Sequence, residues 1–170
     1  VTCGFLPLYA KDLKPEIIEQ KKALKAGEVK VYAAKDAAGI ILQGKIAQVS
    51  ACNKLYKREL FNELKYPEGR SHEDTFVIIK LLLECQKVVI DPNVRYYYYH
   101  RDDSIITKKL SLADYDLIEA SQANYELVKD NYPSVLKQAE MRVLWSHFWL
   151  LDKAIIAEDS TLKDKTIKAE

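Results

Sequence analysis

Two adjacent carboxylates, Glu73 and Asp74, open a strongly apolar stretch that runs from Thr75 to Leu83. A carboxylate at the mouth of a buried helix suits a general base, because apolar surroundings hold the side chain rigid and limit its hydration. This pair predicts removal of a proton from a substrate hydroxyl. A second interpretation stays open, in which Ser71 and Asp74 form a capping box and both acids favour the positive end of the helix dipole.

Several basic or polar side chains lie close to this pair or in the segment before it. His72 either contacts substrate or is a solvated or capping side chain at the helix start. Lys54 and Arg58 are four residues apart, so on a helix they share a face that either meets an anionic diphosphate or is simply solvated. Asn53 belongs to the same stretch.

His100 and Arg101 follow the tyrosine run 96–99. A neutral imidazole ligates divalent cations, and a guanidinium binds phosphate oxygens in bidentate fashion. The alternative is a strand-end pair that is exposed to water or bound to neighbouring acids. Alternation along a strand splits the four tyrosines between two faces, so we expect them to pack in a core rather than to stack on sugars.

The elements that must position these groups are strands in the first two thirds of the chain and helices throughout. Strands are expected at Val1–Tyr9, Ile17–Ile18, Val29–Tyr32, Lys87–Ile90 and, after a turn at Asp91–Asn93, Val94–His100. Helices are expected at Ala33–Leu42, with Gly44 just past the end, at Ala51–Leu64, and from Ser71 to about Gln86. From Ser111 onward only helical patterns occur.

The helix that begins near Ser134 has an apolar stripe at spacings of three and four. Its members are Met141, Leu144, Phe148, Leu151 and Ile155. This stripe predicts that the last helix either packs in a core or docks a partner or a second copy of the chain.

Composition excludes some classes of function. Lys and Arg total 26 and Asp and Glu 25, so no overall field attracts nucleic acid, and we expect no nucleic-acid partner. No apolar run approaches the ~20 residues of a membrane helix. The three cysteines have no paired spacing, and we expect buried free thiols in a reducing compartment.

The motifs together resemble a known family. The stretch Ala51-Cys52-Asn53-Lys54-Leu55-Tyr56-Lys57-Arg58-Glu59-Leu60, then Glu73-Asp74, then the tyrosine run with His100-Arg101, has an order similar to that of family 2 glycosyltransferases of the GT-A fold. The resemblance covers roughly residues 1–106 and only the second half of such a catalytic domain. One position departs from it, since Cys52 stands where relatives frequently have Trp, which puts the acceptor contacts there in doubt.

The resemblance implies an α/β fold. Residues 1–109 would be the C-terminal, acceptor-side half of a GT-A nucleotide-diphospho-sugar transferase domain, a small mixed sheet with helices, and residues 110–170 a helical extension. Asp74 would be the catalytic base and Glu73 its orienting partner or an acceptor ligand. Substrate contacts would come from His72, Asn53, Lys54, Arg58 and Arg101, and His100 would contact the metal.

The implied reaction is inverting transfer of a sugar from a nucleotide-sugar donor to a saccharide or lipid-linked acceptor in bacterial cell-surface polysaccharide synthesis. It would take place in the cytoplasm or at the inner face of the membrane, with peripheral membrane association. The divalent cation, Mg or Mn, would be bound mainly by an N-terminal half that precedes Val1. We therefore expect the chain to be a fragment of a longer protein and to be inactive alone.

A different class of function also fits the residues. In this alternative the chain is a non-catalytic interaction or dimerisation module. Glu73 and Asp74 then only cap a helix, and the C-terminal helices pair with a second copy to give a homodimer.

Overall fold

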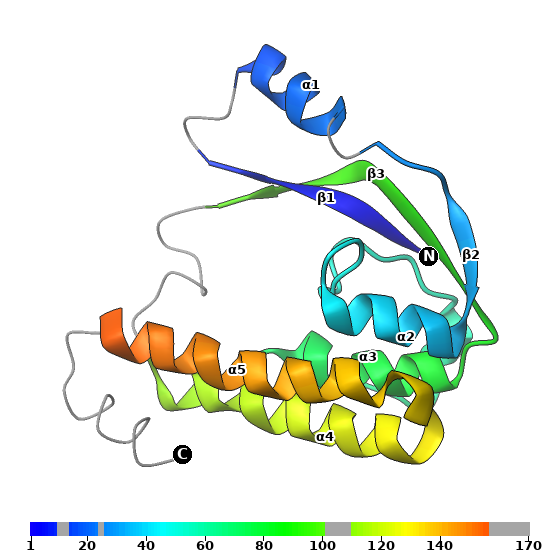
Figure 1. The fold of residues 1–170 in the computed structure, drawn as a ribbon, viewed down its shortest axis with the longest axis vertical. Helices are drawn as coiled ribbons and strands as arrows, with labels where there is room; N and C mark the ends of the chain where they lie inside the picture. The colour runs from blue at the N-terminus through cyan, green and yellow to red at the C-terminus, as the bar shows by residue number, and fades with distance from the viewer. Residues whose placement is uncertain (10–13, 24–25, 101–109, 157–170) are drawn as a thin grey trace.

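The computed structural model describes residues 1–9, 14–23, 26–100 and 110–156. Within them, a small three-stranded sheet lies against a layer of helices, and one short helix lies on the other side of the sheet (Figure 1). The architecture is therefore mixed α/β, as the sequence predicts.

The sheet has the strand order β1-β3-β2, with β1 spanning Thr2–Leu8, β2 Lys30–Ala33 and β3 Lys87–Tyr99. Strand β1 is parallel to β3, whereas β2 is antiparallel to it, so the sheet is mixed. Alternate residues of β1 are buried, beginning with Thr2. The strand accommodates Pro7 because it lies at an edge, where a missing ladder donor is tolerated.

A bulge replaces the turn that was expected at Asp91–Asn93, so β3 is one strand and not two. Cys3 lies opposite Asp91 but Gly4 lies opposite Val94. The extra residues bring the backbone of β3 close to Gly4, where an added Cβ would lie 2.2 Å from the carbonyl oxygen of Pro92. Only glycine fits this approach.

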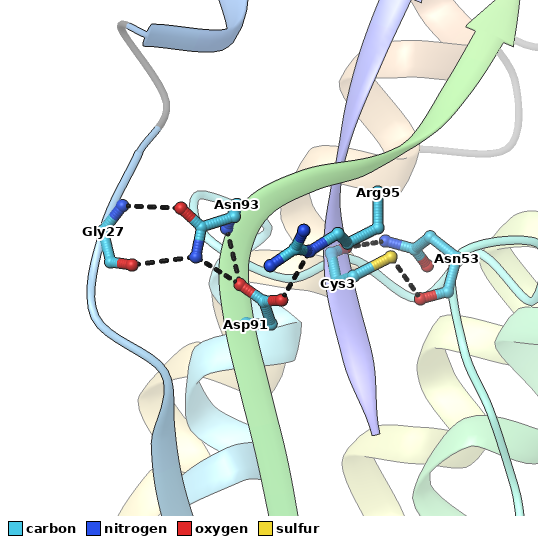
Figure 2. Close-up of polar contacts among 6 residues, drawn as sticks. All are labelled: Cys3, Gly27, Asn53, Asp91, Asn93 and Arg95. Atoms are coloured by element: carbon cyan, nitrogen blue, oxygen red, sulfur yellow. Dashed lines mark hydrogen bonds and ion pairs between the residues drawn. The ribbon is translucent and has the colours of Figure 1, made fainter.

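Side chains of the bulge stabilise it and bind a neighbouring loop (Figure 2). Asn93 donates to Asp91 Oδ1 from its backbone N–H at 2.9 Å and from Nδ2 at 2.6 Å. Arg95 Nε lies 3.0 Å from the other Asp91 oxygen. The Asn93 amide also pairs with both polar groups of Gly27, donating to its carbonyl at 2.9 Å and accepting from its N–H at 3.2 Å.

The helices follow the order expected from the sequence, with two corrections. The α-helices are α1 Pro15–Ala23, α2 Ala34–Gln43, α3 Glu73–Leu83, α4 Asp116–Asn131 and α5 Leu136–Ile156, and the 3-10 turns are η2 Arg58–Phe61, η4 Leu112–Tyr115 and η5 Pro133–Val135. Gly44 ends α2 as expected, with φ 70° and its N–H directed to the carbonyls of Ile40 and Ile41.

The first correction concerns Ile17–Ile18, which lie in α1 rather than in a strand. Pro15 occupies the first helical position, where its fixed φ favours a helix. The second concerns Ala51–Leu64, which is irregular apart from η2. Its backbone bonds to β1 instead, because Cys3 N–H donates to the Asn53 carbonyl at 2.9 Å and Leu55 N–H to the Val1 carbonyl at 2.8 Å. Tertiary pairing therefore overrides local helix propensity there.

The main core lies between the sheet and helices α2 to α5, and its two residues from β3 are Val88 and Ile90. The tyrosines at the other end of β3 are outside it, contrary to expectation: Tyr96, Tyr97 and Tyr99 are 36%, 49% and 47% exposed. All three cysteines are free, as predicted, but only Cys3 and Cys85 are partly buried, whereas Cys52 is exposed.

Candidate functional site

Asp74 lies in the first turn of α3 with its side chain half-buried. Among the described residues it forms no ion pair, and the hydrogen bond that it accepts is a long one, 3.4 Å from Thr75 Oγ1. The other described aspartates that are not exposed each have a cationic partner: Asp91 with Arg95, Asp114 with Lys153, and Asp116 with Arg70. Asp74 therefore differs from them in keeping a carboxylate that no described cation contacts.

The charge of Asp74 nevertheless acts on groups from several segments. These groups are Lys54, Tyr56, Tyr66, His72 and Arg142. They come from the loop before η2, the loop before α3, and α5. The fold thus places two aromatic hydroxyls, an imidazole and two cations within electrostatic range of one carboxylate.

Burial sets the protonation of these groups. It lowers the pKa of Lys54 to about 8, and the negative charge of Asp74 partly opposes that change. Burial likewise lowers the pKa of His72, so its imidazole is neutral at pH 7 although Asp74 favours the charged form. The pKa values of Tyr56 and Tyr66 are raised, chiefly by burial, and the charge of Asp74 raises both further.

Lys54 orders the loop that carries it. Its ammonium donates to the carbonyl of Ser50 at 2.6 Å, to Asn53 Oδ1 at 3.0 Å and to the carbonyl of Gln48. An ammonium has three protons, and all three are used within the chain. Its expected contact with substrate stays a prediction, and would require one of these bonds to be exchanged.

Asn53 is only 3% exposed and is held in the same network. Its Nδ2 donates to the carbonyl of Cys3 at 2.6 Å, and the Cys3 thiol lies 3.3 Å from the Asn53 carbonyl (Figure 2). The side chain of Asn53 therefore joins its loop to β1. Its predicted role in binding substrate is untested.

The start of α3 is anchored by α4 and not by a capping box. His72 occupies the N-cap position without a side-chain cap bond, so the Ser71–Asp74 capping box of the alternative interpretation is wrong. Instead, Ser71 N–H donates to Asp116 Oδ2 at 2.7 Å, and Arg70 lies 3.0 Å from the other oxygen of Asp116. These contacts leave the Asp74 carboxylate uninvolved in capping.

His72 has a left-handed backbone, with φ 54°, and among the described residues it is the only non-glycine with a positive φ. Such conformations cost of order 1 kcal/mol and concentrate at functional sites. Its ring meets Trp149 of α5 edge to face, with centroids 5.3 Å apart. Lys153 packs over the same Trp149 ring and pairs with Asp114 at 2.6 Å. The helical extension thus fixes the imidazole two residues before Asp74.

The remaining predicted residues are not part of this group. Arg58 is exposed on η2. The His100 ring stacks on Tyr9 with ring centroids 4.5 Å apart, and the backbone N–H of His100 donates to the carbonyl of Leu8. Lys54 pairs with Thr2 at the opposite end of β1, so His100 and Lys54 are about 20 Å apart along the strand. Arg101 lies outside the described residues.

Two pockets flank this region. One, of about 790 Å³, has Lys54 and Tyr56 in its wall, and the other, of about 570 Å³, has Arg142. Both volumes are typical of small-molecule sites. Asp74 lines neither pocket, but its charge acts on residues that line each.

Sequence reasoning missed three members of the group around Asp74. Tyr56 lies within the stretch 51–60 that resembles the glycosyltransferase motif. The helix expected there does not indicate that the Tyr56 side chain lies near Asp74. Tyr66 belongs to none of the motifs in the sequence, and in the structure Phe61 stacks on it with ring centroids 5.7 Å apart. Arg142 carries no local signal, because only the packing of α5 brings it near α3.

Within the described ranges, no three His, Cys, Asp or Glu side chains gather into a metal-binding cluster. None of the helices there combines the length and apolarity needed to cross a membrane. Comparisons of the chain with protein families, curated proteins and solved structures find no match.

Proposed function

We propose that the chain is the acceptor side of an inverting glycosyltransferase with a GT-A fold, in which Asp74 is the general base. The observation that carries the proposal is the Asp74 carboxylate itself. It is half-buried, held at the first turn of a rigid helix, and unpaired among the described residues, whereas the comparable aspartates are neutralised. A carboxylate in this state is available to accept a proton from a substrate.

In the proposed reaction, Asp74 takes the proton of an acceptor hydroxyl as that oxygen attacks the anomeric carbon of the donor sugar. The bond from this carbon to the nucleoside diphosphate breaks, and the diphosphate leaves with the bonding electrons. A single displacement inverts the anomeric centre. The phenols of Tyr56 and Tyr66, protonated at neutral pH, supply hydrogen bonds near the same carboxylate.

Glu73 is exposed beside Asp74 and is proposed to bind the acceptor. The acceptor is a saccharide or a lipid-linked saccharide of a bacterial surface polysaccharide, and the reaction would take place in the cytoplasm, with peripheral attachment to the inner face of the membrane. The nucleotide would be bound mainly by a donor-side segment outside residues 1–170. A Mg or Mn ion there would stabilise the leaving diphosphate.

The test measures release of nucleoside diphosphate from a panel of nucleotide sugars. The isolated 170-residue chain is expected to release none, and the full-length protein is expected to be active. Asp74→Asn in the full-length protein should lower the rate at least about 100-fold, because the general base is lost. Asp130→Asn, at an exposed position on α4, is the matched control and should leave the rate unchanged. Transfer by the isolated chain, or an unaltered rate in Asp74→Asn, would contradict the proposal.

A further inference from the structure

The pocket of about 570 Å³ lies between the end of α2 and the first half of α5, and its polar wall is cationic. Lys45 and Lys137 are exposed at its rim, and Arg142 is largely buried in its wall. No described carboxylate lines it. The charge of Asp74 acts on Arg142 from outside the pocket, so the two lysines are the cations that no lining carboxylate balances. A pocket with three cations and no carboxylate in its wall fits an anionic ligand.

The wall also has hydrogen-bonding capacity that the described chain leaves unmet. Arg142 Nε and Gln138 Oε1 are both buried and have no hydrogen-bond partner among the described residues. Buried polar atoms without partners are costly and are rare in folded proteins, so they point to a polar occupant. The Arg142 guanidinium also stacks over the Trp145 ring, with its central carbon 4.1 Å from the ring centroid.

The same pocket opens onto exposed apolar surface. Met141 lines the pocket and begins the apolar stripe of α5, which continues through Leu144 and Phe148. Trp145, which also lines the pocket, is exposed on the same helix next to Leu144. These four side chains are 43–60% exposed. The distance from Met141 to Phe148 along the helix axis is about 10 Å. A hydrocarbon chain leaving the pocket would therefore find a continuous apolar track.

We propose that this pocket binds the phosphate of an amphiphilic ligand, an alkyl phosphate, whose hydrocarbon chain lies along the α5 stripe. The cations of the pocket favour this occupant over a neutral lipid. The unmet polar atoms favour it over a second copy of α5, because an apolar helix packed on the stripe would leave them unpaired. The proposal concerns binding alone and does not depend on the sugar-transfer reaction.

The test is calorimetric titration of the 170-residue chain with decyl phosphate below its micelle concentration. Inorganic phosphate and decyl glucoside serve as probes of the head and of the chain separately. Decyl phosphate is expected to bind saturably and at least about tenfold more tightly than either probe, because the hydrocarbon and the charge both contribute. If inorganic phosphate bound as tightly as decyl phosphate, the pocket would be a simple anion site. If decyl glucoside bound as tightly as decyl phosphate, the ligand would be held by apolar surface alone. Either result overturns the proposal.

Two pairs of variants locate the site. The double variant Lys45→Gln, Lys137→Gln should weaken the binding of decyl phosphate at least about tenfold. The matched double variant Lys35→Gln, Lys80→Gln, at exposed positions on α2 and α3, should leave that binding unchanged. Phe148→Ser should weaken the binding of decyl phosphate but not that of inorganic phosphate. Leu112→Ser, at an exposed position on η4, should leave the binding of both unchanged. All four positions in the lysine pairs are exposed, so the fold is expected to survive.

Unchanged binding in the pocket variant would overturn the assignment. So would a second outcome: a dimer in sedimentation that Phe148→Ser dissociates, together with no binding of decyl phosphate. That result would assign the stripe to an interface between copies.

Discussion

The backbone N–H of Ser71 donates to Oδ2 of Asp116 at 2.7 Å, which joins the start of α3 to the start of α4 across 45 residues of sequence. The bond replaces an ordinary N-cap, because His72 at that position makes no side-chain cap bond. The orientation of Asp74 therefore depends on a residue of the helical extension.

Asp116→Ala is expected to lower the free energy of unfolding by about 2 kcal/mol, since it removes a charge-assisted hydrogen bond and an ion pair with Arg70. Urea denaturation measures the change. Asp130→Ala, an exposed position on the same helix, should shift the free energy by less than about 0.5 kcal/mol. Equal effects in the two variants would show that the link between α3 and α4 contributes nothing.

Stability should rise with pH through the titration of Lys54. Its pKa in the folded chain is about 8, against 10.5 in the unfolded chain. Between these values the unfolded chain holds a proton that the folded chain has released, so the free energy of unfolding increases with pH. The rise is at most about 3 kcal/mol and is smaller to the extent that solvent reaches the ammonium.

The measurement compares unfolding free energies from pH 7.5 to 10 in the wild type and in Lys54→Met. Cysteines and tyrosines contribute to both proteins, so the difference between the two curves isolates Lys54. The curves should diverge as pH rises, and exposed Lys57→Met should follow the wild type. Parallel curves for Lys54→Met and the wild type would disprove the shift in pKa.

Substitution by alanine should lower the stability of the fold by very different amounts at two glycines. In Gly4→Ala the new Cβ would lie 2.2 Å from the carbonyl oxygen of Pro92, so the bulge of β3 must move, at a cost of about 3 kcal/mol or more. In Gly69→Ala no atom lies within 4 Å, and only the positive φ of 71° is penalised, by about 1 kcal/mol. Thermal unfolding of both variants tests this order, and an equal or reversed loss would refute the close approach.

Local patterns predicted the elements whose signals agree with their surroundings. The apolar run after Asp74 forms α3, and Gly44 ends α2 through its left-handed backbone, because helix periodicity and a C-cap glycine act within a few residues. The mixed α/β class follows from the same signals.

Tertiary contacts decided the rest. Residues 51–64 lose their expected helix to pairing with β1, and the tyrosines of β3 lie beyond the part of the strand that the core covers. At the candidate site, the position of Asp74 in the sequence identifies it, whereas Arg142 interacts with its charge from α5. An electrostatic interaction between residues 68 positions apart leaves no periodic trace in sequence.

The left-handed backbone of His72 constrains how this segment can diverge. Glycine, asparagine or aspartate would retain the turn into α3 at little conformational expense, whereas valine, isoleucine or threonine would crowd its Cβ against the preceding peptide. Any homologue that preserves the geometry should avoid β-branched residues here even where the imidazole has been lost. A β-branched substitution at this position would instead signal that the helix begins differently and that the neighbouring aspartate has been redirected.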